Sequence, residues 1–120
     1  MTNPDSLESL RQRLEQFARA RDWEQFHSPK NLSMALIAEA AELVEHFQWL
    51  SEAQSSALDD KKLEEVRLEL ADILLYLVRI SDRLGIDLVR AGNDKIDINE
   101  QRYPADKVKG SAKRAQEYEK

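Results

Sequence analysis

Hydrophobic residues recur every three or four positions over most of the chain, and this spacing predicts helices. The pattern covers residues 7–20, 31–50, 61–84 and 88–102, and it is weakest in the last of these segments. Ser or Asp residues precede the first, third and fourth segments, and Gly85 follows the third, as is typical of helix ends. No segment alternates hydrophobic and polar residues as a strand would. The sequence therefore predicts an all-α fold, a four-helix bundle.

The second and third segments carry carboxylates beside their hydrophobic faces. At about 100° per residue, Glu39 falls within the hydrophobic stripe of the second segment, and Glu42 falls on its flank. Glu69 and Asp72 take the same two places in the third segment. Half-buried carboxylates that converge repel one another unless a cation compensates them. Their oxygen ligands suit Mg²⁺, Mn²⁺ or Ca²⁺, whereas the chain has no Cys and only two His for a softer metal.

Composition narrows the class of protein further. The chain has 120 residues, enough for one domain, which we expect over residues 1–104 with a polar C-terminal tail over 105–120. A net charge of -5 indicates no general affinity for nucleic acid or for an anionic membrane. Neither a signal-peptide pattern nor an apolar run of bilayer length is present, so we expect a cytoplasmic protein.

The third segment is hydrophobic around much of its circumference. Its apolar residues include Leu68, Leu70, Ile73, Leu74, Leu75, Leu77, Val78 and Ile80. A helix that is hydrophobic on most sides must be covered on most sides. One copy of so short a chain offers too few helices for this, so we expect a homo-oligomer.

Four stretches of the sequence together indicate a family. They read RDWEQFHSPKN, EAAELVEHFQW, EVRLELADILLYLVRI and KIDINEQRYP, in that order. The ordered set resembles the MazG-like all-α nucleotide pyrophosphohydrolases, and most of all the branch of small deoxycytidine triphosphate pyrophosphatases (dCTPases). The resemblance implies a helical bundle assembled as a homotetramer with sites between subunits. It also implies Mg²⁺-dependent hydrolysis of a (deoxy)nucleoside triphosphate, dCTP or a modified dCTP, to the monophosphate and pyrophosphate, which clears non-standard nucleotides from the pool.

The resemblance also assigns roles to individual residues, with Mn²⁺ as an alternative to Mg²⁺. The implied metal ligands are Glu39, Glu42, Glu69 and Asp72. The implied catalytic residues, one of which activates the attacking water, are Glu42 and Glu45. The implied phosphate-binding residues are Lys95, Asn99 and Arg102. The implied base-binding residues are Trp23, His27, Trp49 and Tyr76.

Simpler explanations exist for each of these residues. Acidic pairs three residues apart are common on solvated helix faces, where they pair with Lys or Arg. Aromatic residues more often form a core or an interface than a base-binding wall, and a loop histidine more often has an ordinary partner. The chain could therefore be a non-catalytic helical interaction module whose acidic faces dock a basic partner. A ferritin-like di-metal bundle is disfavoured because Glu-x-x-His pairs are absent.

Overall fold

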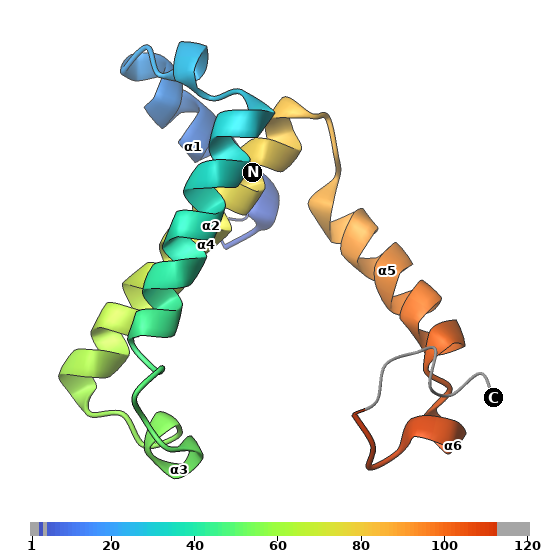
Figure 1. Ribbon diagram of the computed structural model, residues 1–120. Coiled ribbons are helices and arrows are strands. Elements are labelled where there is room, and N and C mark those ends of the chain that lie inside the picture. Colours follow the sequence, from blue (N-terminus) through green and yellow to red (C-terminus); the bar gives the residue numbers. More distant parts are fainter. Residues whose placement is uncertain (1–2, 4, 113–120) are drawn as a thin grey trace. The chain divides into compact units, whose positions relative to one another are not determined.

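The computed structural model describes residue 3 and residues 5–112, and all regular elements in this part are helical (Figure 1). The predicted all-α fold is therefore confirmed for the described residues. The long helices are α1 (Leu7–Ala20), α2 (Pro29–Glu45), α4 (Asp60–Arg83) and α5 (Leu88–Arg102). Between and after them lie the short 3₁₀ helix η1 (Glu24–Phe26) and the short helices α3 (Glu52–Ser55) and α6 (Ala105–Val108).

The long helices begin after Ser or Asp cap residues, and α2 begins two residues before the predicted residue 31. A Ser or Asp side chain accepts a hydrogen bond from the backbone N–H three residues later, which satisfies one of the free donors of the first turn. These N-cap residues are Ser6, Ser28, Asp59 and Asp87. At the other end of α4, Gly85 follows with a φ of 67°, a left-handed conformation that glycine adopts without a steric penalty.

Helix α2 is shorter than the sequence pattern predicts. It starts at Pro29, whose missing N–H costs nothing in a first turn, and it ends at Glu45 instead of Leu50. The next residues form successive turns, because the His46 and Phe47 N–H groups bond to carbonyls only three residues back. Trp49 therefore lies outside the helix.

The described chain divides into two compact units, Met1–Ile86 and Asp87–Lys120. In the first unit, α2 and α4 lie side by side and antiparallel, and α1 packs against α4 (Figure 1). Helices α5 and α6 belong to the second unit. The division into a domain over residues 1–104 and a polar tail over 105–120 stays a prediction, and α6 lies within the range predicted as the tail. The rest of that tail, residues 113–120, lies outside the described residues.

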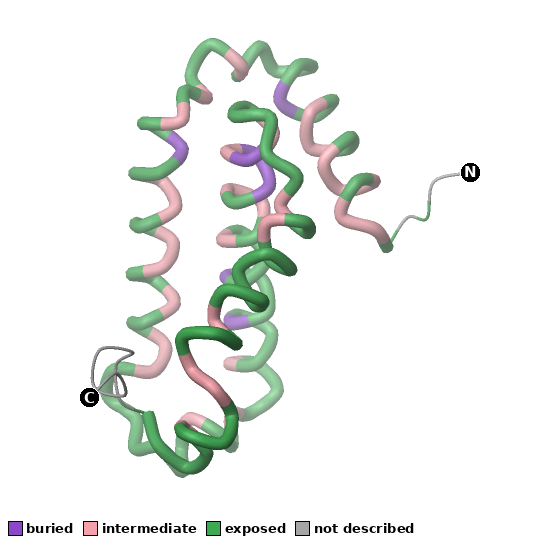
Figure 2. Tube along the Cα trace, turned by 90° about the vertical axis from the view of Figure 1, so that its right-hand side faces the viewer, coloured by how far each residue is buried: buried purple, intermediate pink, exposed green. Residues whose placement is uncertain are grey.

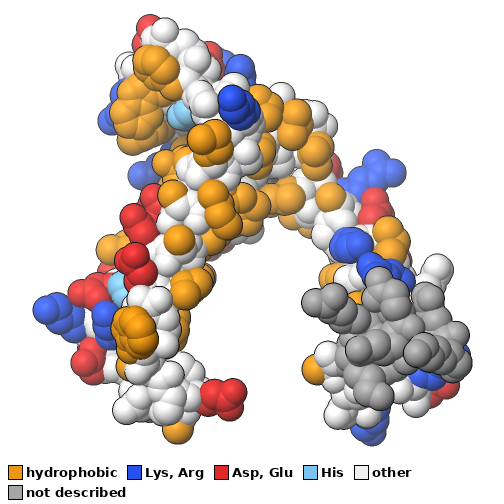
Figure 3. All heavy atoms as spheres, viewed as in Figure 1, with side chains coloured by type: hydrophobic (Ala, Val, Ile, Leu, Met, Phe, Trp, Pro, Cys, Tyr) orange, Lys and Arg blue, Asp and Glu red, His pale blue; other side chains and the backbone are white. Residues whose placement is uncertain are grey.

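The first unit buries little of its hydrophobic surface. Its fully buried hydrophobic residues are Ala18, Leu32, Val66 and Val78 (Figure 2). Large hydrophobic side chains are exposed on all of its long helices, and Figure 3 shows them along the body formed by α2 and α4. Exposed apolar surface of this extent marks an interaction surface. No helix among the described residues is both long enough and apolar enough to span a bilayer.

Candidate metal and nucleotide site

Three of the acidic residues selected from the sequence meet between α2 and α4. Glu39 lies in the middle of α2, and Glu69 and Asp72 lie one turn apart on α4. One carboxylate oxygen from each lies within 4.8 Å of the other two. The antiparallel pairing of α2 with α4 brings them together, since both helices turn their hydrophobic stripes inward.

This acidic cluster is short of compensating charge. Glu69 is only 8 % exposed, and Glu69 Oε1 and Glu39 Oε2 are buried without a hydrogen-bond partner. Within the described part of the chain, no Lys or Arg forms an ion pair with any of the three carboxylates. Buried carboxylates without partners cost stability, so the arrangement calls for a ligand.

The lack of compensating positive charge also raises the pKa values of carboxyl groups in the cluster. Burial and the neighbouring Glu42 and Glu39 together raise the pKa of Glu69 to about 7. Burial also raises the pKa of Glu39, with a further contribution from Glu42. A bound cation would favour the charged forms instead. Converging oxygens with unused lone pairs fit a hard divalent cation such as Mg²⁺.

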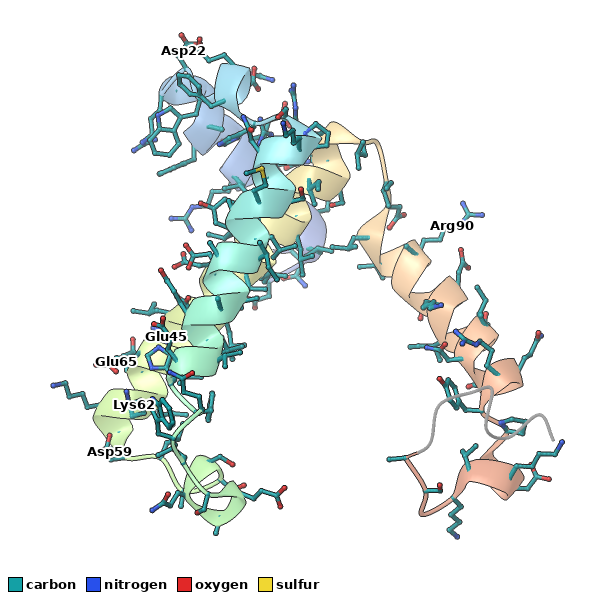
Figure 4. The ribbon with its side chains drawn as sticks, viewed as in Figure 1. Asp22, Glu45, Asp59, Lys62, Glu65 and Arg90 are labelled. Atoms are coloured by element: carbon teal, nitrogen blue, oxygen red, sulfur yellow. The ribbon has the colours of Figure 1, made fainter. Side chains whose placement is uncertain are left out.

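The remaining acids of the ladder lie progressively further from the cluster. Glu42 is exposed, yet it is close enough to raise the pKa values of both Glu39 and Glu69. Glu45 is the exposed last residue of α2, and Figure 4 shows it near Lys62 and Glu65 at the start of α4. Glu42 therefore lies near the cluster, and the catalytic roles of Glu42 and Glu45 stay predictions.

A cavity of about 260 Å³ lies next to the acidic cluster. Its lining consists of Leu14, Phe17, Trp23, His27, Leu32, Asp72, Leu75, Tyr76 and Arg79. Three of the four residues assigned to the nucleobase line it, and Asp72 belongs to both the cavity and the cluster. The fourth, Trp49, is 86 % exposed and is not part of the lining. The described chain thus offers one apolar pocket that opens onto its acidic centre.

The pocket also contains a residue that the sequence analysis did not select. Arg79 is 3 % exposed, and its Nε donates a hydrogen bond of 3.0 Å to His27 Nδ1. Its Nη1 donates to Asp82, whose other carboxylate oxygen accepts a hydrogen bond from Arg11. The network therefore ties η1 and α1 to α4 beside the pocket. Its only signal in the sequence is one arginine inside the apolar run LLYLVRI.

The three residues assigned to phosphate binding lie on α5. Lys95, Asn99 and Arg102 are spaced four and three residues apart, which places them on one helical face. They belong to the second unit, which is described by itself. Their role therefore stays a prediction.

Comparison with known proteins fits this site. Residues 35–118 match the MazG-like family. The chain is similar to dCTP pyrophosphatase 1 of Rattus norvegicus, with 46 % identity over 109 residues, and to that of Homo sapiens, with 41 % identity over 111 residues. These alignments cover 89 % and 91 % of the chain but only 64 % and 65 % of the relatives.

A solved structure adds to the comparison. The crystal structure of a pyrophosphatase from Archaeoglobus fulgidus is similar, with a TM-score of 0.79 and 34 % sequence identity. The similarity covers 87 % of this chain and 97 % of that one. The family match covers well over half of the sequence, and the structural match extends over almost all of a relative. The chain belongs to the MazG-like family.

Proposed function

We propose that the chain is a Mg²⁺-dependent nucleoside triphosphate pyrophosphohydrolase that acts on dCTP or a modified dCTP. The observation that carries this proposal is the cluster of Glu39, Glu69 and Asp72, with two buried carboxylate oxygens that lack partners. Solvated acidic helix faces do not bury carboxylates in this way. The similarity to dCTP pyrophosphatase 1 supports the reaction and the substrate class.

The cluster is suited to hold the metal ion. Glu39, Glu69 and Asp72 would supply the oxygen ligands, and Glu42 would complete them from the next turn of α2. When bound, Mg²⁺ neutralises charge on the triphosphate and lowers the pKa of water at the site. Mn²⁺, which takes the same ligands, would substitute for it.

The carboxylates also direct the chemistry. Glu42 accepts a proton from the attacking water, with Glu45 as the second candidate for this role. The water oxygen attacks the α-phosphorus, and the bond to the oxygen bridging the α- and β-phosphates breaks. The products are the nucleoside monophosphate and pyrophosphate. Lys95, Asn99 and Arg102 would bind the phosphates of the leaving pyrophosphate through charge-assisted hydrogen bonds.

The cavity provides a place for the base. Trp23 and Tyr76 line it, and aromatic rings stack on nucleobases. Asp72 joins the cavity to the cluster, so a base in the cavity places its phosphates toward the carboxylates. This continuity is what a nucleotide, with one apolar end and one anionic end, requires.

Further copies of the chain would complete the protein. Large apolar residues are exposed on α1, α2 and α4, and some of them are more than half exposed. A homo-oligomer would cover these surfaces, and the family resemblance indicates a tetramer. The other participants in the proposed reaction are the nucleotide, Mg²⁺ and water.

The test is pyrophosphate release from a panel of nucleoside triphosphates with and without Mg²⁺. We expect Mg²⁺-dependent release that is fastest with dCTP or a modified dCTP and is lost in Glu42→Gln. Glu64→Gln is the matched control, because Glu64 is an exposed glutamate of α4 that pairs with Arg67 at 2.7 Å. If the folded protein releases no pyrophosphate from any nucleotide, the proposal is wrong and the interaction module remains.

A further inference from the structure

The hydrogen bond between Arg79 and His27 determines which nitrogen of the imidazole carries a proton. An arginine Nε–H can only donate, so His27 Nδ1 must accept in this 3.0 Å contact. A neutral imidazole whose Nδ1 accepts carries its proton on Nε2. Within the described part of the chain, Nε2 has no hydrogen-bond partner. His27 lines the cavity, so it offers a free N–H donor there.

The surroundings keep His27 neutral. Burial lowers the pKa of His27, the charges of Arg79 and Arg83 lower it further, and Glu24 opposes them. A neutral ring held in one tautomer is a directional donor, whereas a ring that exchanges between tautomers can donate or accept. The electrostatics and the hydrogen bond therefore favour the same state of the ring.

Stabilisation of the fold alone does not explain the position of Arg79. Its guanidinium is almost fully buried, yet Nη2 has no hydrogen-bond partner. The carboxylate that pairs with Nη2 is Glu24, at 3.7 Å, which is too long for a hydrogen bond. A buried arginine with an unused donor costs stability that an apolar residue of similar size would not. The guanidinium Nη1 donates a hydrogen bond to Asp82, and Arg11 donates another to the same carboxylate. The network orients one imidazole at the cavity wall.

We propose that Arg79 is a positioning residue for base selection, which fixes His27 so that its Nε2–H donates to N3 of a cytosine base. This inference rests on the proposed function. Cytosine N3 accepts a hydrogen bond, whereas N3 of thymine or uracil carries a proton and cannot accept; O2 accepts in all three bases, so only a donor to N3 discriminates. A donor fixed at the cavity wall therefore discriminates between these pyrimidines, as sites that hydrogen-bond a substrate reject analogues that lack the partner.

The first experiment observes the imidazole without substrate. ¹⁵N-detected NMR distinguishes the two tautomers, and the chain has only two histidines, so His46→Gln assigns the signals. We expect His27 to carry its proton on Nε2 alone in the wild-type protein. In Arg79→Met we expect a mixture of tautomers and a higher pKa for His27. A proton on Nδ1 in the wild type, or an unchanged ring in Arg79→Met, would overturn the proposal.

Arg83→Met is the matched control for this experiment. Arg83 is exposed and contributes charge near His27, but it donates no hydrogen bond to the ring. We expect this variant to raise the pKa of His27 while leaving the proton on Nε2. If it changes the tautomer as Arg79→Met does, charge and not the hydrogen bond controls the ring, and the proposal fails.

The second experiment measures selection. We expect Arg79→Met to lower kcat/KM for dCTP about tenfold, mainly through KM, and to lower it much less for dTTP, so that the preference for dCTP shrinks. Arg79→Lys, whose ammonium also donates, should restore part of the preference. Equal losses for both nucleotides would indicate a merely structural role. If the wild type hydrolyses no nucleotide, base selection fails together with the proposed function, while the tautomer measurement still tests the positioning of His27.

Discussion

Among the described residues, Asp22 is the only non-glycine residue with a positive φ, at 55°. It closes α1, where the Trp23 N–H bonds to the Ala18 carbonyl at 2.9 Å and the Asp22 N–H to the Arg19 carbonyl at 3.1 Å. This pair of bonds is a helix end that glycine favours. We expect Asp22→Gly to raise the free energy of unfolding by about 0.5 kcal/mol, because Asp tolerates this conformation less well than Gly.

Urea unfolding followed by circular dichroism measures this change. Asp22→Ala is the control, since a Cβ without a polar group is least tolerated at positive φ, and we expect it to lower the free energy of unfolding by about 1 kcal/mol. The lost hydrogen bond from Gln25 to the Asp22 carboxylate is exposed and contributes little. Equal effects of Gly and Ala would contradict the conformational argument.

The raised pKa of Glu69, about 7, predicts how stability depends on pH and metal. A carboxyl whose pKa is higher in the folded state stabilises the fold below the ordinary pKa of about 4.5, and this contribution is lost as pH rises toward 7. We therefore expect Glu69→Gln to be more stable than the metal-free wild type at pH 8, with little difference near pH 4.5. Thermal melts at both pH values measure this.

With metal bound, we expect the wild type to be more stable than Glu69→Gln at pH 8. Mg²⁺ or Mn²⁺ binds the folded wild type through Glu69 and its neighbours, so it should raise the wild-type melting temperature at pH 8. Glu69→Gln should show no such shift, because one ligand has lost its charge. Glu64→Gln, an exposed change on the same helix, should behave as the wild type does. A metal-induced shift that survives Glu69→Gln would contradict the assignment of the cluster.

At the scale of elements, two glycines should respond oppositely to the same substitution. Neither Gly85 nor Gly92 has an atom within 4 Å of the position that a Cβ would take. Gly92 lies inside α5, so we expect Gly92→Ala to stabilise that helix by about 0.5–1 kcal/mol. Gly85 has a φ of 67°, so Gly85→Ala should destabilise by about 1 kcal/mol.

Hydrogen exchange of the α5 amides, together with urea unfolding, measures both changes at one protein concentration. If Gly92→Ala instead destabilises the assembled protein, a second copy of the chain or a bound nucleotide approaches that position closely. Opposite signs for the two variants would show that backbone conformation, and not space, decides each effect.

The starts of the helices could be predicted because they depend on local contacts. Ser6, Asp59 and Asp87 each cap a helix from three residues away, and such a contact is visible in the sequence. The end of α2 could not be predicted, because hydrophobic spacing continues to Leu50 while the backbone turns after Glu45. Hydrophobic spacing indicates which side chains face inward, but it does not indicate at which residue the backbone hydrogen bonds stop following the α-helical pattern.

The site residues also differ in whether a local sequence pattern predicts their position. Glu39, Glu69 and Asp72 could be placed together because each follows the inward stripe of its own helix. The contact between Arg79 and His27 joins residues 52 positions apart and follows no period, so no local pattern indicates it. Trp49 was assigned through a resemblance, and within one chain it is exposed on a turn that the helical pattern did not reveal.

At the scale of the whole molecule, the apolar surface of the first unit exceeds what it can bury by itself. On α2, Met34, Ile37 and Val44 are all more than half exposed, and on α4 Leu63, Leu68 and Leu70 are as well. Met34, Ile37 and Val44 share one face of α2, and Leu63 and Leu70, seven residues apart, share one face of α4, so these side chains form faces and are not scattered. Scattered surface hydrophobics need no explanation, whereas continuous faces of two packed helices indicate an interface.

A charge placed on such a face should prevent assembly. Ile37 is 68 % exposed in the single chain, and we expect it to be buried when further copies associate. Light scattering coupled to size exclusion should therefore give the wild type a mass that is a multiple of 13.9 kDa. Ile37→Glu should shift the mass toward 13.9 kDa at the same concentration, because burying an unpaired carboxylate weakens association about 100-fold or more.

Gln16→Glu on the exposed side of α1 adds the same charge at a polar position and should keep the wild-type mass. If Ile37→Glu assembles as the wild type does, α2 does not contribute Ile37 to the interface. If the wild type itself is monomeric at micromolar concentration, the exposed faces have another occupant. If the wild type assembles and Ile37→Glu loses nucleotide hydrolysis together with assembly, the acidic cluster of one copy needs a neighbouring copy to act.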